Sequence, residues 1–62
     1  MSVTATWVDP SQNVRTTIVY ATRRGFLSAY TRSKKFVLDH AVDDKNCFII
    51  RPNNIKQYRK MK

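Results

Sequence analysis

The sequence is poor in cysteine, glycine and proline. It contains one Cys, one Gly and two Pro among 62 residues. A single cysteine excludes an intramolecular disulfide, which is typical of a chain that works in a reducing compartment. One glycine excludes a glycine-rich phosphate-binding loop. Because the chain also has an apolar content of 42% and few chain-breaking residues, it is not expected to be disordered.

Long apolar runs are also absent. The longest, Ile18–Ala21 and Cys47–Ile50, are far shorter than the ~20 residues that a membrane-spanning helix needs. The N-terminal residues do not show a basic stretch followed by an apolar one, so a secretory signal is not expected either. We therefore predict a cytoplasmic protein, in the host cytoplasm if the source is a virus.

Acidic residues are the scarcest charged group. The sequence has four acidic residues and 12 Lys and Arg residues, and the net charge is +8. All of them lie at Asp9 or within 39–44, so the stretches 10–38 and 45–62 are basic without any carboxylate. So small a domain cannot bury or neutralise this charge, and its surface must be positive. The expected partner is an acidic protein surface or a nucleic acid.

The N-terminal third predicts a β-hairpin. β-forming residues alternate over Val3–Val8 and place Ala5 and Trp7 on one face. The segment Asp9–Asn13 has the composition of a turn, and Val14–Ala21 follows as a second strand.

A helix is predicted after Thr22, whose side chain can cap its first turn. Its apolar and small residues recur at helical spacing on one stripe, and its opposite side is basic. Two positions for the end of the helix are compatible with the sequence, because Phe36–Leu38 can either continue the helix or begin an extended segment. The inward stripe consists of Phe26, Ala29, Tyr30, Ser33 and Val37, and the basic side carries Arg24, Arg32 and Lys35.

The C-terminal part predicts one more strand. Residues 39–46 have the composition of a polar loop, and Cys47–Arg51 reads as a third strand. In the basic tail at 53–62, Ile55, Tyr58 and Met61 recur at every third position, which fits either one helical turn or a frayed arm.

This order predicts the α+β class. A small ββαβ domain over residues 1–52 would have an antiparallel sheet with one helix packed across it, and a basic C-terminal tail would follow. A chain of this length buries only about 60% of its unfolded surface, too little for a deep catalytic pocket.

Catalytic and metal-binding signals are weak. His40 with the neighbouring Asp39, Asp43 and Asp44 could bind a divalent cation, but a short polar stretch without a second cluster is typical of a solvated turn. Cys47 and His40 could be drawn as nucleophile and base, but Cys47 is expected in an apolar strand where a thiol is inert. We expect no enzyme activity, no metal and no cofactor.

The aromatic and basic residues supply the candidate binding surface. Trp7, Phe26, Phe36 and Phe48 are expected in the core, whereas the tyrosines can keep a hydrated hydroxyl group. Tyr58, between basic neighbours, is the best candidate for stacking on a base or packing at an interface. The predicted binding residues are Arg24, Arg32, Lys35, Arg51, Lys56, Tyr58, Arg59 and Lys60.

Several residues also carry a family resemblance. Val8-Asp9, Ser11, Tyr20-Ala21 at the end of the hairpin, and Arg51-Pro52 at the end of the last strand lie in an order that resembles the small early-expressed inhibitors of bacterial RNA polymerase made by T-odd podophages. The resemblance implies a ββαβ domain whose last strand docks arginines on an acidic jaw of the polymerase, and Arg51 is the matching position. The helix is acidic in that family and basic in this chain.

Two functions follow as expectations. The first is a non-enzymatic phage-type effector that inhibits a host transcription or nucleic-acid enzyme by occupying an acidic or nucleic-acid-binding surface. The alternative is a protein that binds DNA or RNA directly through phosphate contacts, without sequence specificity. A component of a ribonucleoprotein is a third possibility. Charge alone does not separate them, because acidic protein surfaces and nucleic acids attract the same basic patch.

Overall fold

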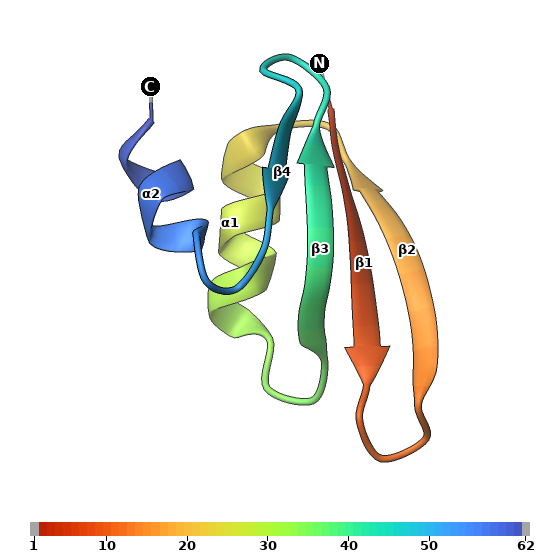
Figure 1. Ribbon diagram of the computed structural model, residues 1–62. Coiled ribbons are helices and arrows are strands. Elements are labelled where there is room, and N and C mark those ends of the chain that lie inside the picture. The colour runs from red at the N-terminus through yellow and green to blue at the C-terminus, as the bar shows by residue number, and fades with distance from the viewer. Residues whose placement is uncertain (1, 62) are drawn as a thin grey trace.

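A computed structural model describes residues 2–61 of the chain. In chain order the elements are β1 (Val3–Asp9), β2 (Val14–Tyr20), α1 (Arg23–Arg32), β3 (Val37–Asp43), β4 (Phe48–Ile50) and α2 (Ile55–Lys60). The four strands form one antiparallel sheet in the order β2-β1-β3-β4, with α1 across one face and α2 beside α1 (Figure 1). The predicted α+β class is confirmed. Neither helix combines the length and the apolar composition that a membrane span requires.

The predicted hairpin is confirmed. β1 and β2 pair in an unbroken register from Val3 opposite Tyr20 to Asp9 opposite Val14. The connecting turn closes by a hydrogen bond of 2.6 Å from the Asn13 amide to the Asp9 carbonyl, and Asn13 adopts a φ of 57°. Asparagine tolerates this left-handed conformation better than most residues, which is why the turn forms locally.

The predicted loop over 39–46 is wrong for most of its length. Val37–Asp43 forms β3, which pairs with β1, so the sheet has four strands among the described residues instead of the expected three. A register shift opposite Thr6 and Trp7 breaks the simple alternation, so that Leu38 and Ala41, three positions apart, are both buried. Because the bulge removes the period of two, the sequence pattern does not show this strand.

The helix also ends earlier than its apolar stripe suggested. α1 stops at Arg32, and the Ser33 amide donates to the Ala29 carbonyl at 2.9 Å. Of the two interpretations of Phe36–Leu38, the extended one is right, since β3 starts at Val37. Val37 is exposed and does not continue the inward stripe of the helix.

Phe26 is the centre of the core. It is fully buried, and its ring centroid lies 6.3 Å from that of Trp7, 5.8 Å from Tyr20 and 6.2 Å from Tyr58. Aromatic pairs at these distances stabilise the packing beyond their buried area. The core position predicted for Phe36 is wrong, because 40% of it is exposed.

The C-terminal segment is a short helix that packs on the core. Ile55 and Tyr58, on one side of α2, are buried with the residues of the sheet. Of the two possibilities for 53–62, the helical turn is therefore the one that forms. Lys62, at the end of that segment, lies outside the described residues.

Candidate binding groove between the two helices

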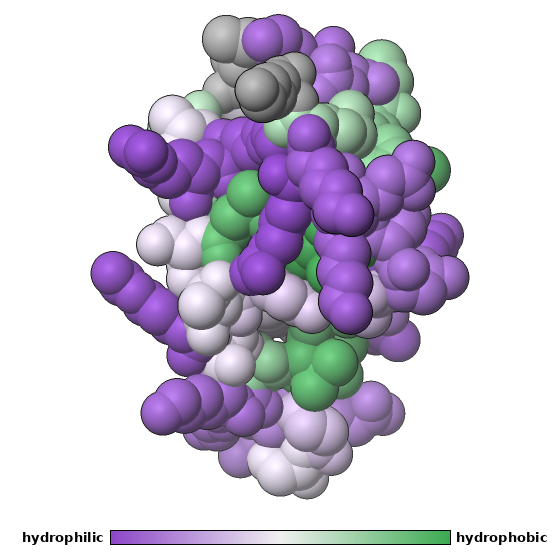
Figure 2. Space-filling model, turned by 90° about the vertical axis from the view of Figure 1, so that its left-hand side faces the viewer, coloured by the Kyte–Doolittle hydropathy of each residue, from purple (hydrophilic) through white to green (hydrophobic). Residues whose placement is uncertain are grey.

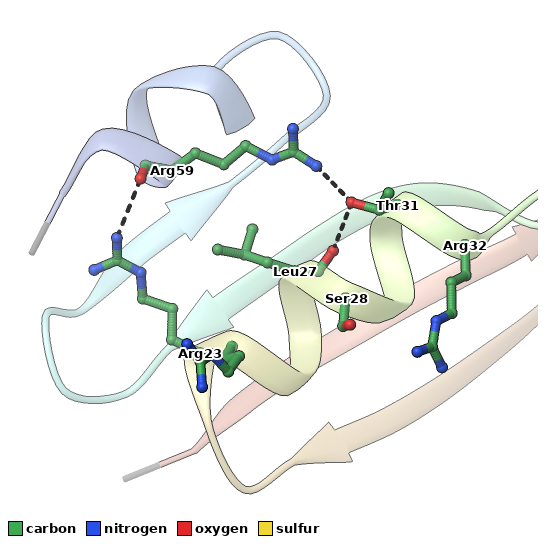
Figure 3. A pocket seen from close by; sticks show the side chains of 7 residues that line it. Arg23, Leu27, Ser28, Thr31, Arg32 and Arg59 are labelled. Carbon is green, nitrogen blue, oxygen red and sulfur yellow. Dashed lines mark hydrogen bonds between the residues drawn. The ribbon is translucent and has the colours of Figure 1, made fainter.

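An open groove of about 720 Å³ lies between α1 and α2 (Figure 3). Four arginine side chains surround it, and one leucine and two hydroxyl residues complete its lining. We call it the arginine groove; it is lined by Arg23, Arg24, Leu27, Ser28, Thr31, Arg32 and Arg59.

α1 supplies most of the groove because of its residue spacing. Residues four positions apart lie on one side of a helix, so Arg24, Ser28 and Arg32 follow each other along the outer surface. The other side of the helix is anchored to the sheet by Phe26. The Thr22 side chain caps the first turn by accepting from the Gly25 amide at 3.0 Å.

α2 contributes Arg59, which is held in place across the gap between the helices. Its guanidinium donates to Thr31 Oγ1 at 2.7 Å, and the Thr31 hydroxyl in turn donates to the Leu27 carbonyl at 3.0 Å (Figure 3). Arg23 donates to the Arg59 carbonyl at 3.4 Å. These bonds connect two helices that are far apart in the sequence.

Two of the guanidinium groups also lie over aromatic rings. Arg23 lies 4.9 Å from the ring centroid of Tyr58, and Arg59 lies 5.6 Å from that of Tyr30. The negative face of an aromatic ring attracts a cation and restricts its motion. Arg23 and Arg59 are therefore each held by an aromatic ring as well as by a hydrogen bond.

The charge of the arginine groove is not neutralised within the described part of the chain. In residues 2–61 the Lys and Arg ion pairs are Arg15 with Asp39 at 3.1 Å and Lys35 with Asp9 at 3.9 Å, and neither involves a residue of the groove. Four positive charges around one hollow repel each other, and an anion bound between them would relieve that repulsion.

The side of the molecule on which α2 lies carries many long polar side chains. In Figure 2, hydrophilic side chains project over most of this side and leave only small apolar areas between them. The arginine groove thus lies on a largely hydrophilic side of the molecule, and the net charge of +8 makes the surface of the domain positive overall.

Three of the predicted binding residues, Arg24, Arg32 and Arg59, come together in the groove. Lys35 does not, since it follows the end of α1, pairs with Asp9 and lies over the Phe36 ring at 5.7 Å. The remaining predicted basic positions are exposed but do not line the groove: Arg51, Lys56 and Lys60.

The prediction that Tyr58 is available for stacking is wrong. It is fully buried, its ring stacks on Phe48 at 5.8 Å, and its hydroxyl donates to Asp43. The sequence interpretation also missed Arg23, which is half-buried and reaches the groove. The spacing of Arg23, Leu27 and Thr31, four residues apart, was the one available signal for it.

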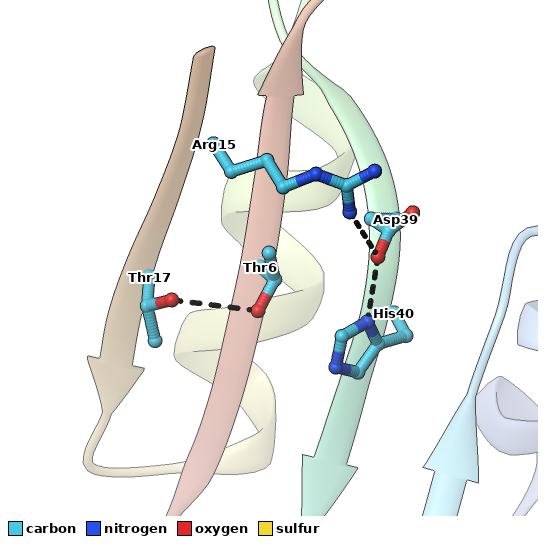
Figure 4. A network of polar contacts seen from close by, with 5 residues as sticks. All are labelled: Thr6, Arg15, Thr17, Asp39 and His40. Atoms are coloured by element: carbon cyan, nitrogen blue, oxygen red, sulfur yellow. Dashed lines mark hydrogen bonds and ion pairs between the residues drawn. The ribbon is translucent and has the colours of Figure 1, made fainter.

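A separate polar network lies on β1, β2 and β3 (Figure 4). His40 Nδ1 and Asp39 Oδ2 are 2.7 Å apart, and Arg15 approaches the same oxygen at 3.1 Å. The His40 hydrogen bond, followed by the charge of Arg15, holds the pKa of Asp39 below its ordinary value. Beside them, the hydroxyl groups of Thr6 and Thr17 are 3.5 Å apart.

Of the residues considered for a metal, Asp39 and His40 contact each other, but Asp43 and Asp44 have other partners. Asp43 is buried against Tyr58, whereas Asp44 accepts hydrogen bonds from Ser2. Among residues 2–61 no group of three or more His, Cys, Asp or Glu side chains is arranged to hold a metal ion. The position predicted for Cys47 is wrong, because this residue precedes β4 and is exposed.

No family model, no curated protein and no solved structure matches this chain. The resemblance to phage inhibitors of RNA polymerase therefore stays a prediction. Any function has to be argued from the groove and the surface around it.

Proposed function

We propose that the protein is a non-enzymatic binding module that engages an acidic surface of a partner protein through the arginine groove. The observation that carries the proposal is that four arginine side chains from two helices line one hollow, and none of them is paired with a carboxylate of residues 2–61. Such an arrangement attracts an anionic surface over a distance and aligns it on contact.

The chemistry of the groove favours carboxylates of a protein. All of its charged residues are arginines, whereas Lys56 and Lys60 lie outside it. Arginine is enriched and lysine depleted in protein interfaces, and the planar guanidinium binds a carboxylate through two parallel hydrogen bonds. Contacts with Tyr30 and Tyr58 order two of the arginines beforehand, which lowers the entropy lost on binding.

An effector that inhibits a host enzyme is the role that fits this chemistry best. Transcription and nucleic-acid enzymes present surfaces whose function depends on charge, and a basic module of 62 residues could cover one of them. The resemblance to the podophage inhibitors supports this role. Arg51, exposed directly after β4, would be a second contact in that case. The effector would act in the host cytoplasm and needs no cofactor.

Direct binding of DNA or RNA is the second candidate. Ser28 adds a hydroxyl group to the lining, and hydroxyl and guanidinium groups together are common donors to phosphate oxygens. The net charge of +8 would attract a nucleic acid without any base contact.

Affinity capture from a bacterial lysate, with and without nuclease, tests the proposal. Arg24→Glu/Arg59→Glu reverses two charges of the groove, and Lys34→Glu/Lys45→Glu makes the same change of net charge at exposed positions outside it. We expect a protein to be captured in the presence of nuclease, to be lost with the groove variant and to be retained with the control.

The other outcomes are equally informative. Capture that disappears on nuclease treatment would support the nucleic-acid candidate. Equal capture by the wild type and both folded variants would contradict a binding role for the groove, and would mean that its charge only solvates the surface.

A further inference from the structure

β2 is an edge strand with an unprotected outer side. It pairs with β1 along all seven residues, and no other strand of the described chain lies on its far side. Protein edge strands are usually blocked by charged side chains, by proline, by a bulge or by short length. β2 has seven residues without a proline or a bulge, and its one charged side chain, Arg15, is directed to Asp39 of β3. The other edge strand, β4, has three residues and is followed closely by Pro52.

An apolar groove runs beside this edge. It has a volume of about 340 Å³ and separates β2 from the end of α1. Ile18 and Phe36 are 42% and 40% exposed in its lining, so together they present apolar surface to solvent beside the edge. We call it the β2 groove; its apolar lining consists of Trp7, Ile18, Tyr20, Ala29 and Phe36.

The two features together match the way extended peptides are bound. An added strand forms main-chain hydrogen bonds with the free edge, and alternate side chains of that strand point to the same face of the sheet. Because Ile18 is on the helix side of β2, every second side chain of an added strand would reach the β2 groove.

The charges decide what kind of strand fits. Arg32, which is not in an ion pair within residues 2–61, lies at the rim of the β2 groove, and β2 carries no acidic residue. A second copy of the chain would bring another charge of +8 to this edge, which opposes self-pairing. An acidic segment would be attracted instead.

We propose that β2 binds an extended segment of a partner protein as an additional strand, with apolar side chains of that segment in the β2 groove and acidic side chains between them that are attracted by the positive charge of the domain. This surface is distinct from the arginine groove, although Arg32 borders both. The proposal therefore holds whether or not the arginine groove binds an acidic protein.

A fluorescently labelled synthetic peptide in which valine and glutamate alternate is the probe. We expect Ile18→Glu to weaken its binding at least about tenfold, because the new charge occupies the groove and repels the peptide. Ile49→Glu, the matched control, makes the same substitution on the other edge strand, β4, where 49% of the side chain is exposed. It should change the affinity less than about threefold.

Two further measurements separate strand addition from general attraction. A peptide methylated on alternate backbone nitrogens should bind at least about tenfold more weakly, since it cannot form the ladder. Amide exchange at residues 14–20 should slow when the unmodified peptide is bound. Equal binding of both peptides, or equal effects of Ile18→Glu and Ile49→Glu, would overturn the proposal.

The remaining controls identify other occupants. Arg24→Glu/Arg59→Glu should keep the affinity for the peptide within about threefold, and a larger loss than that of Ile18→Glu would place the peptide in the arginine groove instead. Sedimentation equilibrium should show a monomer, whereas a dimer with protected β2 amides in the absence of peptide would assign this edge to a second copy. If Ile18→Glu fails to fold, Ile18→Ala, which adds no charge, replaces it as the test variant for peptide binding.

Discussion

Tyr58 and Asp43 join α2 to β3 inside the core. The Tyr58 hydroxyl donates to Asp43 Oδ2 at 2.5 Å, and both residues are buried. Burial, together with this hydrogen bond, raises the pKa of Tyr58 above its ordinary value. Because Arg59 is the next residue in the chain, the bond that fixes α2 also determines where one wall of the arginine groove stands.

Removing that hydroxyl should destabilise the fold. Tyr58→Phe keeps the ring but leaves Asp43 Oδ2 without its donor, which should lower the free energy of unfolding by about 1–3 kcal/mol in urea titrations. Tyr30→Phe is the control, since it removes a tyrosine hydroxyl from a half-buried site on α1. Equal losses in both variants would contradict a specific role for the buried bond.

The core assignment can be tested with two phenylalanines. Phe26→Ala leaves a cavity at the centre of the core and should lower the free energy of unfolding by about 3–5 kcal/mol, enough to unfold so small a domain. Phe36→Ala removes the same side chain from a position that is 40% exposed, and should cost much less. Thermal melts followed by circular dichroism make the comparison, and a cooperative, unchanged melt of Phe26→Ala would exclude the helix packing described here.

The distribution of binding energy should reveal the class of partner. If the partner is a protein, a few positions supply most of the binding free energy. Arg24→Ala or Arg59→Ala should then reduce it by at least about 2 kcal/mol, while Lys56→Ala should reduce it little. On nucleic acid, each basic residue that contacts a phosphate should contribute similarly, and each loss should lower the slope of log K against log salt by about one unit. Isothermal titration at several salt concentrations distinguishes the two patterns.

Stability should fall in acid. Hydrogen bonds from Ser11 hold the pKa of Asp9 below its ordinary value of 3.8, and the Ser2 amide does the same for Asp44. The unfolded chain therefore binds protons at a higher pH than the native one, so the stabilisation is complete above 3.8 and is lost as the pH falls through the lower native pKa values.

Melting temperatures measured between about pH 2 and pH 6 check this trend. Asp9→Asn cannot titrate at position 9, so its melting temperature should fall less steeply with acid than that of the wild type. If the melting temperature of the variant fell with acid as steeply as that of the wild type, Asp9 would not contribute to the acid dependence of stability.

The turn before β4 offers a stabilising substitution. Cys47 adopts a φ of 50°, in the left-handed region that asparagine tolerates better. Cys47→Asn should therefore raise the free energy of unfolding by up to about 1 kcal/mol in urea titrations. Asn13, at a φ of 57°, provides the reverse test, since Asn13→Ala should destabilise the first turn. A loss of stability in Cys47→Asn would show that the thiol has a packing role.

Local patterns predicted the parts of the fold that form from neighbouring residues. Alternation along Val3–Val8 and turn chemistry at Asp9–Asn13 were enough for the hairpin, because pairing partners lie close in the chain. The Thr22 cap and the inward position of Phe26 likewise follow from helical spacing. β3 could not be predicted in this way, because its bulge arises only when it pairs with β1.

The sequence by itself determined the charge balance, the hairpin, the start of α1 and the basic side on which Arg24 and Arg32 lie. Only the tertiary structure decided that Tyr58 is buried, that Lys35 turns away to Asp9, and that Arg59 completes a groove with residues of α1. The physical reason is that charge and local periodicity are properties of neighbouring residues. The burial of a side chain and the packing of two helices depend on contacts between segments that are distant in the chain. Arg59 and Thr31, for example, are 28 positions apart.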